Sequence, residues 1–338
     1  MMKLGSRPQI IKLAHDLHIA PGDDAALSII AFCLRSIRGI RKEFPCSTLE
    51  ELLETAATRL DTKFYEIHTD EELESLKQDF LKRGELGFAN LDRNLNDSVF
   101  AITFKLINPR RGFRHYASVI DCRGTKAARG YFSKWHELAH LFTQTDQLRL
   151  VFTRTHTSLE IADPEEALME QIAGAIGFLP EIIQAQIRGE LSFEEIERLR
   201  ATLCPTASQQ AAFIGVARAW PNPCLYLEAR IALLKQEDRL RRQQHAFAFR
   251  IVPKGELRAV MVVPNDAGLA QGLHIHQNMR VPPNSVITNV FDGGQDYAEA
   301  AENLNLWQSS NGTVLPNRRV QVKAKRNWDL VRVLMLPV

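Results

Sequence analysis

The segment Trp135-His136-Glu137-Leu138-Ala139-His140 constrains the fold of this chain more than any other stretch. It carries the pattern H-E-x-x-H, and histidines four residues apart share one face when the segment is an α-helix. The next residues, Leu141 and Phe142, are apolar, so the helix is expected to be largely buried, where unpartnered imidazoles are costly. The sequence therefore predicts a buried helix over about 132–142 whose histidine face meets other polar groups.

Two imidazoles on one helical face can both reach a tetrahedral Zn²⁺ ion at about 2.0–2.1 Å. In such a site His136 and His140 are metal ligands, and Glu137 is the general base that takes a proton from metal-bound water. Mn²⁺ or Fe²⁺ would accept the same donors. The alternative interpretation is a helix that carries two surface histidines and a solvated Glu137 with no metal.

A catalytic zinc site has three protein ligands and a water, so a third ligand is expected downstream. We favour Glu166, because it lies near the start of a second helix. Asp163-Pro164 predicts that start, and the helix should run to about Gly177. Glu166 could instead complete a capping box with Asp163. The other candidate ligands are Glu170, Asp146 and His156.

A zinc peptidase also needs a donor for the oxyanion of its tetrahedral intermediate. Tyr116 is the candidate, on a strand expected over Arg114–Asp121 just before the site helix. The same strand is expected to pair edge-on with an extended substrate. His115 and Tyr131 are alternative donors, and a strand tyrosine that only fills the core is the competing interpretation.

Two segments resemble the site helices of a known family, the ImmA/IrrE-type metallopeptidases of bacteria and their mobile elements. They are Trp135–Phe142, W-H-E-L-A-H-L-F, and Asp163–Pro180, D-P-E-E-A-L-M-E-Q-I-A-G-A-I-G-F-L-P. The resemblance covers about residues 60–185 and continues more loosely over Ser192–Leu240. It implies a cytosolic, gluzincin-like peptidase with Glu166 as the third zinc ligand. It also implies a protein substrate such as a helix-turn-helix repressor, whose cleavage switches on a stress response or mobile-element genes.

The periodicity of the chain predicts an α+β fold in which a small sheet lies beside the two site helices. The resemblance implies that this part of the chain is a zincin-like metallopeptidase core. The expected segments are a helical lead-in over 1–60, the core over 61–185, a helical region over 186–245 and a strand-rich domain over 246–338. Ser47 and Glu50 predict a capping box, and Tyr226–Gln243 reads as a long helix. The expected C-terminal strands are Ala246–Val252, Glu256–Val263, Val286–Val290, Val320–Lys323 and Leu330–Leu336. The strand-rich domain is assigned to sensing or substrate docking.

Composition limits the other function classes. The 338 residues carry a net charge of +2, which disfavours direct binding of nucleic acid, and the longest apolar stretch is too short to cross a membrane. Five scattered cysteines indicate reduced thiols and a cytoplasmic protein. His274 and His276 are expected on one strand face, as partner-facing surface or an accessory metal site. The second hypothesis is a regulatory or adaptor protein that binds a transcription factor or DNA, with a structural or vestigial metal site.

Overall fold

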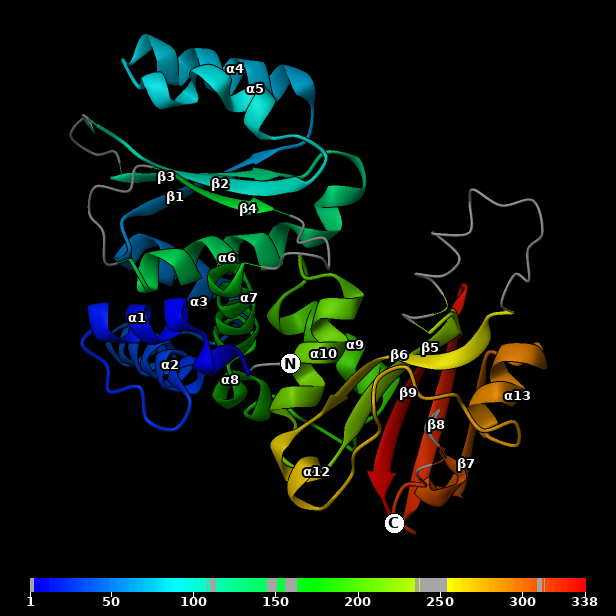
Figure 1. Ribbon diagram of the computed structural model, residues 1–338. Helices are drawn as coiled ribbons and strands as arrows, with labels where there is room; N and C mark the ends of the chain where they lie inside the picture. Colours follow the sequence, from blue (N-terminus) through cyan, green and yellow to red (C-terminus); the bar gives the residue numbers. More distant parts are fainter. Residues whose placement is uncertain are drawn as a thin grey trace. The chain divides into compact units, whose positions relative to one another are not determined.

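The computed structural model describes residues 3–107, 109, 114–144, 151–155, 163–234, 237, 254–308, 312 and 314–338, with the backbone alone for 151–155. The fold is α+β, as the sequence predicts (Figure 1). Unit 1 comprises Met1–Ala185 and Arg198–Gly215, and unit 2 comprises Gln186–Glu197 and Val216–Val338. Arg198–Gly215 returns to unit 1, so the helical region expected over 186–245 is shared between the two units.

Unit 1 begins with four helices. These are η1 (Leu4–Ser6), α1 (Pro8–Asp16), α2 (Ala25–Glu43) and α3 (Leu49–Arg59). Of these, α2 and α3 are capped by side chains at their N-termini. The Asp24 side chain accepts hydrogen bonds from the first amides of α2. The expected capping box of α3 is wrong by one residue, because Thr48 and Glu51 form it. Ser47 instead donates both its amide and its hydroxyl to the Glu51 carboxylate.

A four-stranded sheet forms the centre of unit 1, in the order β1-β3-β2-β4. Its strands are β1 (Thr62–Ile67), β2 (Val99–Lys105), β3 (Tyr116–Asp121) and β4 (Val151–Thr155). β1 runs parallel to β3, and the other pairs are antiparallel. Because β3 is paired on both edges, the expectation that it binds a substrate strand edge-on is wrong.

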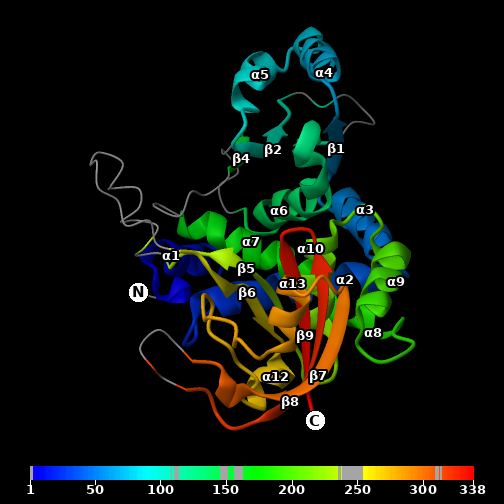
Figure 2. The same ribbon diagram turned by 90° about the vertical axis from the view of Figure 1, so that its right-hand side faces the viewer.

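The two faces of this sheet are covered by different helices (Figures 1 and 2). One face packs against α4 (Asp70–Lys82), η2 (Leu86–Asn90) and α5 (Leu91–Asn94). There the rings of Phe80, Phe88 and Phe104 stack, with centroids 4.0 and 4.1 Å apart. The other face carries α6 (Gly130–Phe142), which follows η3 (Gly124–Arg129) and contacts α7 (Pro164–Ile176). Three further helices follow, α8 (Pro180–Gln184), α9 (Phe193–Leu203) and α10 (Gln209–Ala219).

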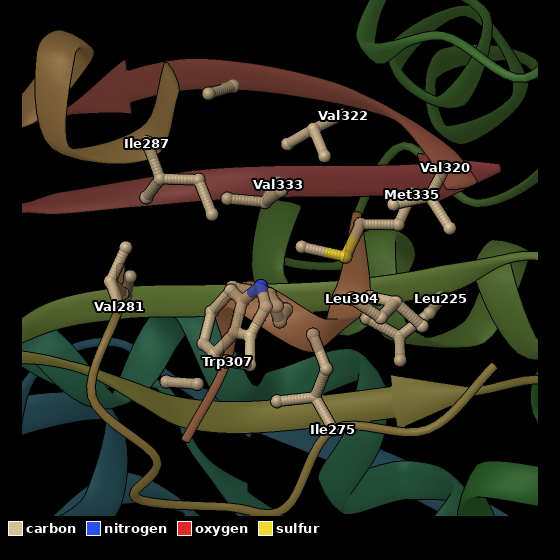
Figure 3. Packing of buried hydrophobic residues seen from close by; sticks show 14 of the residues in the cluster. Leu225, Ile275, Val281, Ile287, Leu304, Trp307, Val320, Val322, Val333 and Met335 are labelled. Carbon is tan, nitrogen blue, oxygen red and sulfur yellow. The ribbon is translucent and has the colours of Figure 1, made fainter. Parts of the chain in front are cut away.

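Unit 2 is built on an antiparallel sheet in the order β6-β5-β9-β8-β7. Its strands are β5 (Leu225–Ala232), β6 (Glu256–Pro264), β7 (Tyr297–Asn303), β8 (Arg319–Asn327) and β9 (Leu330–Pro337). Short helices connect them, α12 (Asp266–Ala270), α13 (Val286–Asp292) and η5 (Leu304–Leu306). Alternate strand residues such as Val322 and Val333 pack with Ile287 of α13 and with Trp307 in one apolar core (Figure 3).

Three expectations for unit 2 are wrong. Tyr226–Gln243 does not begin as a helix, because β5 pairs with β6 and β9 and is buried on both faces over most of its length. Val286–Val290 is part of α13, whose first amide donates to the carboxylate of Glu302 on β7 at 2.6 Å. His274 and His276 lie in a loop rather than on a strand. The structure confirms strands at Glu256–Val263, Val320–Lys323 and Leu330–Leu336, while Ala246–Val252 lies outside the described residues.

Candidate metal centre

The H-E-x-x-H segment lies on α6, and eleven of the thirteen residues of this helix are buried. A helix with no exposed face must be held from several sides, here by the sheet and by α7. The Tyr131 hydroxyl donates to the carbonyl of Gly177, the residue that ends α7, at 2.6 Å. A Cβ atom at Gly177 would lie 2.8 Å from the Trp135 ring, so glycine allows the end of α7 to contact α6 closely.

The start of α7 places Glu166 beside the histidines. The side chain of Asp163 accepts a hydrogen bond from the amide of Glu165 at 2.9 Å and thereby caps the helix, as the sequence predicts. Fully buried apolar residues of α7, including Leu168 and Ile172, fix the rotation of the helix. Glu166 sits in the first turn, and only 14% of its side chain is exposed.

The donor atoms of His136, His140 and Glu166 lie within 4.8 Å of one another, and we call these three residues the three-donor cluster. The two Nε2 atoms are 3.2 Å apart, and each lies 3.1 or 3.2 Å from a different oxygen of Glu166. In a tetrahedral site with bonds of about 2.0–2.1 Å, the ligand atoms are about 3.3 Å apart. The three residues therefore fit a metal ion with little adjustment.

Hydrogen bonding alone does not account for all three contacts in this cluster. If His136 and His140 both donate from Nε2 to Glu166, neither nitrogen can accept from the other, and their 3.2 Å contact is not a hydrogen bond. If one Nε2 is deprotonated to accept from the other, it no longer donates to Glu166. A cation satisfies the three donor atoms together, which favours the metal over the alternative of two histidines paired without one.

The charge state of Glu166 suits a metal ligand. Burial alone would raise the pKa of this carboxyl, but hydrogen bonds from His136 and His140 and their positive charge outweigh burial. The pKa of Glu166 therefore lies well below its usual value. The carboxylate remains ionised at neutral pH, in the form that binds cations.

Glu137 faces the sheet rather than solvent, so the expected alternative of a solvated Glu137 is wrong. Its side chain is fully buried, and the hydroxyl of Thr103 on β2 donates to Oε2 at 2.6 Å. Thr103 is paired in register with Ser118 on β3, and their hydroxyl oxygens are 2.6 Å apart. Sequence reasoning missed both hydroxyl residues. The signal was a pair of polar residues on strand faces otherwise occupied by apolar side chains.

The structure does not bring every expected residue to the cluster. The Tyr116 hydroxyl donates to the side chain of Gln144, just beyond the end of α6, at 3.0 Å. Glu170 is exposed on α7 and is not one of the three donors. Asp146 and His156 lie outside the described residues.

The alternative oxyanion donors and the accessory histidines have other surroundings. The hydroxyl of Tyr131 is already used by Gly177, and His115 pairs with Asp61. His274 Nε2 and His276 Nδ1 are 3.1 Å apart, but no third donor joins them within the described part of the chain.

Comparisons with known proteins leave the chain without an assigned relative. No protein-family model matches it, and no curated protein matches it. In the described residues, no helix combines the length and apolarity that crossing a membrane requires.

Proposed function

We propose that this protein is a zinc-dependent metalloendopeptidase with a zincin-like core. His136, His140 and Glu166 hold the metal, and Glu137 is the general base. The observation that carries the proposal is the three-donor cluster, in which the two Nε2 atoms are 3.2 Å apart and each lies 3.1 or 3.2 Å from an oxygen of Glu166. Both histidines lie on α6, the helix that also bears Glu137.

When bound, the metal supplies a Lewis acid that polarises the scissile carbonyl and lowers the pKa of water to about 7. Glu137 accepts the proton of the attacking water and delivers it to the departing amine, as its position beside His136 allows. Thr103 holds one carboxylate oxygen of Glu137 at 2.6 Å and thus limits rotation of the carboxylate. Tyr116 remains our candidate donor to the oxyanion, and movement of its hydroxyl away from Gln144 would be required.

The substrate is proposed to be a regulatory protein, such as a helix-turn-helix repressor, by resemblance of the two site helices to ImmA/IrrE-type peptidases. The same resemblance supports a cytoplasmic location and a role in transcription regulation or stress response. Mn²⁺ or Fe²⁺ would also accept the two nitrogens and one carboxylate. The metal content of the chain purified without added metal identifies the ion.

The test is cleavage of a candidate repressor co-expressed with the chain. Glu137→Gln should abolish cleavage while keeping the metal, because the loss of a general base costs about 10²–10⁴-fold in rate. Glu170→Gln is the matched control, since Glu170 is an exposed glutamate outside the cluster, and it should cleave normally. Cleavage that survives Glu137→Gln would refute the enzymatic proposal and favour a regulatory or adaptor protein with a structural metal.

A further inference from the structure

A second group of metal-binding side chains lies at the end of the parallel strands β1 and β3. Ile67 is in register with Asp121, and the amide of Cys122 donates to the carbonyl of Ile67 at 2.8 Å. The next residues, His68 and Cys122, are therefore level with each other. Glu66 precedes His68 by two residues and so shares its face of the strand. We call Glu66, His68 and Cys122 the Glu66 cluster.

The donor atoms of the Glu66 cluster lie close to the spacing of a metal site. Cys122 Sγ is 3.8 Å and His68 Nε2 is 4.0 Å from the same oxygen, Oε2 of Glu66. With a Zn–S bond of about 2.3 Å and Zn–N and Zn–O bonds of about 2.0–2.1 Å, these separations become about 3.5 and 3.3 Å. The side chains of His68 and Glu66 are 57% and 42% exposed, so both can move by the small distance required.

The two oxygens of the Glu66 carboxylate have different partners. Lys134 Nζ lies 2.7 Å from Oε1, while Oε2 faces the thiol and the imidazole. Ligating carboxylates commonly hold such an outer hydrogen-bond partner on their second oxygen. The charges of Lys134, the carboxylate and a Cys122 thiolate add to −1, which leaves a net attraction for a divalent cation.

We propose that Glu66, His68 and Cys122 form a second metal site, selective for a borderline or soft divalent cation such as Zn²⁺ or Cd²⁺. The mixed oxygen, nitrogen and sulfur donors match the preferences of these ions and not those of Mg²⁺ or Ca²⁺. The site is separate from the three-donor cluster and does not depend on peptidase activity.

The Cys122 thiol adds to the selectivity for borderline or soft cations. Cys122 is buried, and its thiol must lose its proton before the sulfur can bind a cation. A bound cation replaces that proton, which leaves to water as the metal–sulfur bond forms. Only an ion with a strong bond to sulfur compensates for this cost.

The test is titration of the metal-stripped full chain with Cd²⁺, followed by its ultraviolet cadmium–thiolate charge-transfer band and by bound metal per chain. The three-donor cluster contains no sulfur, so the band reports the Glu66 cluster alone. We expect the band in the wild type and in His136→Ala, and its loss in Cys122→Ser. Cys46→Ser is the matched control, because Cys46 is also buried and belongs to neither cluster. It should keep the band.

A second variant, His68→Ala, tests the site independently in case Cys122→Ser misfolds. His68→Ala changes an exposed side chain and should weaken Cd²⁺ binding by about tenfold or more, since loss of even an outer-shell partner costs that much. His15→Ala, at an exposed histidine of α1, should bind normally. A band that persists in Cys122→Ser, a wild type without the band, or unchanged affinity in His68→Ala would overturn the second site. None of these results bears on the three-donor cluster, which His136→Ala and bound-metal counts report separately.

Discussion

Removing the metal from the three-donor cluster should lower the melting temperature of unit 1. The cluster joins α6 to α7 and exists only when the unit is folded, so the ion stabilises the folded state by mass action. At a free Zn²⁺ concentration 100 times Kd, this stabilisation is about 2.7 kcal/mol.

The expected shift follows from the size of the unfolding unit. At an unfolding entropy of about 2.1 cal/mol/K per residue, the roughly 200 residues of unit 1 give about 0.4 kcal/mol/K. Dividing 2.7 kcal/mol by this value predicts a rise of about 6 °C on adding zinc. If all 338 residues unfold together, the rise is about 4 °C.

The assay is calorimetry of the metal-stripped chain with and without Zn²⁺, carried out in the His68→Ala background so that the Glu66 cluster contributes little. The shift should disappear in Glu166→Gln and His140→Ala, and it should remain in Glu170→Gln. A shift of full size in Glu166→Gln, or no shift in the parent, would refute the ligand assignment. Because each variant is compared with itself, any change in its metal-free stability does not enter.

Three further perturbations have defined outcomes. Thr103→Val removes a 2.6 Å hydrogen bond to the buried Glu137 carboxylate, worth about 1.5–3 kcal/mol, so kcat should fall about 10–150-fold with little change in KM. Thr103→Ser keeps the hydroxyl and should restore kcat. A low kcat in Thr103→Ser would show that the hydroxyl does not position Glu137. Burial raises the pKa of Asp121, but hydrogen bonds from Arg123 and Lys126 outweigh burial and hold it below its usual value. The stability that Asp121 contributes is therefore present above about pH 4 and lost as pH falls through its lowered pKa, so Asp121→Asn should show a shallower acid decline in melting temperature. Asn265 accepts hydrogen bonds from the amides of Cys224 and Gly268 and donates to two carbonyls, so Asn265→Ala should destabilise unit 2 by about 3 kcal/mol or more in urea unfolding. A loss below about 1 kcal/mol would show that water replaces these bonds.

The elements that local signals define were predictable from the sequence. The periodicity of α6 and the Asp163 cap of α7 are local, and so is the i,i+4 spacing of His136 and His140. Elements defined by distant partners were not. β5 contains Glu228, Ala229 and Arg230, which favour helices, but pairing with β6 and β9 overrides that preference. The β-branched start of α13 suggested a strand. Ser285 caps this helix locally, and its first amide also donates to Glu302, sixteen residues away.

The candidate site shows the same division. The choice of Glu166 over Glu170 depends on the rotation of α7 against α6, which the buried face of Leu168 and Ile172 sets in three dimensions. Thr103 and Ser118 become partners of Glu137 only because β2 and β3 pair in one particular register. Strand register is a property of the folded sheet, so no spacing along the chain could have revealed this contact.

The discontinuity of the two units has a consequence for how the protein is made. Unit 1 is completed by Arg198–Gly215, and a Cβ atom at Gly215 would lie 2.1 Å from the ring of Phe178, so α10 is fitted closely against the end of the first stretch. A nascent chain released at residue 185 would lack this closing segment, even though every residue of the three-donor cluster had already been translated. Part of unit 2 must therefore be synthesised before unit 1 can finish folding. A proteolytic fragment that ends at residue 185 is not equivalent to the native unit.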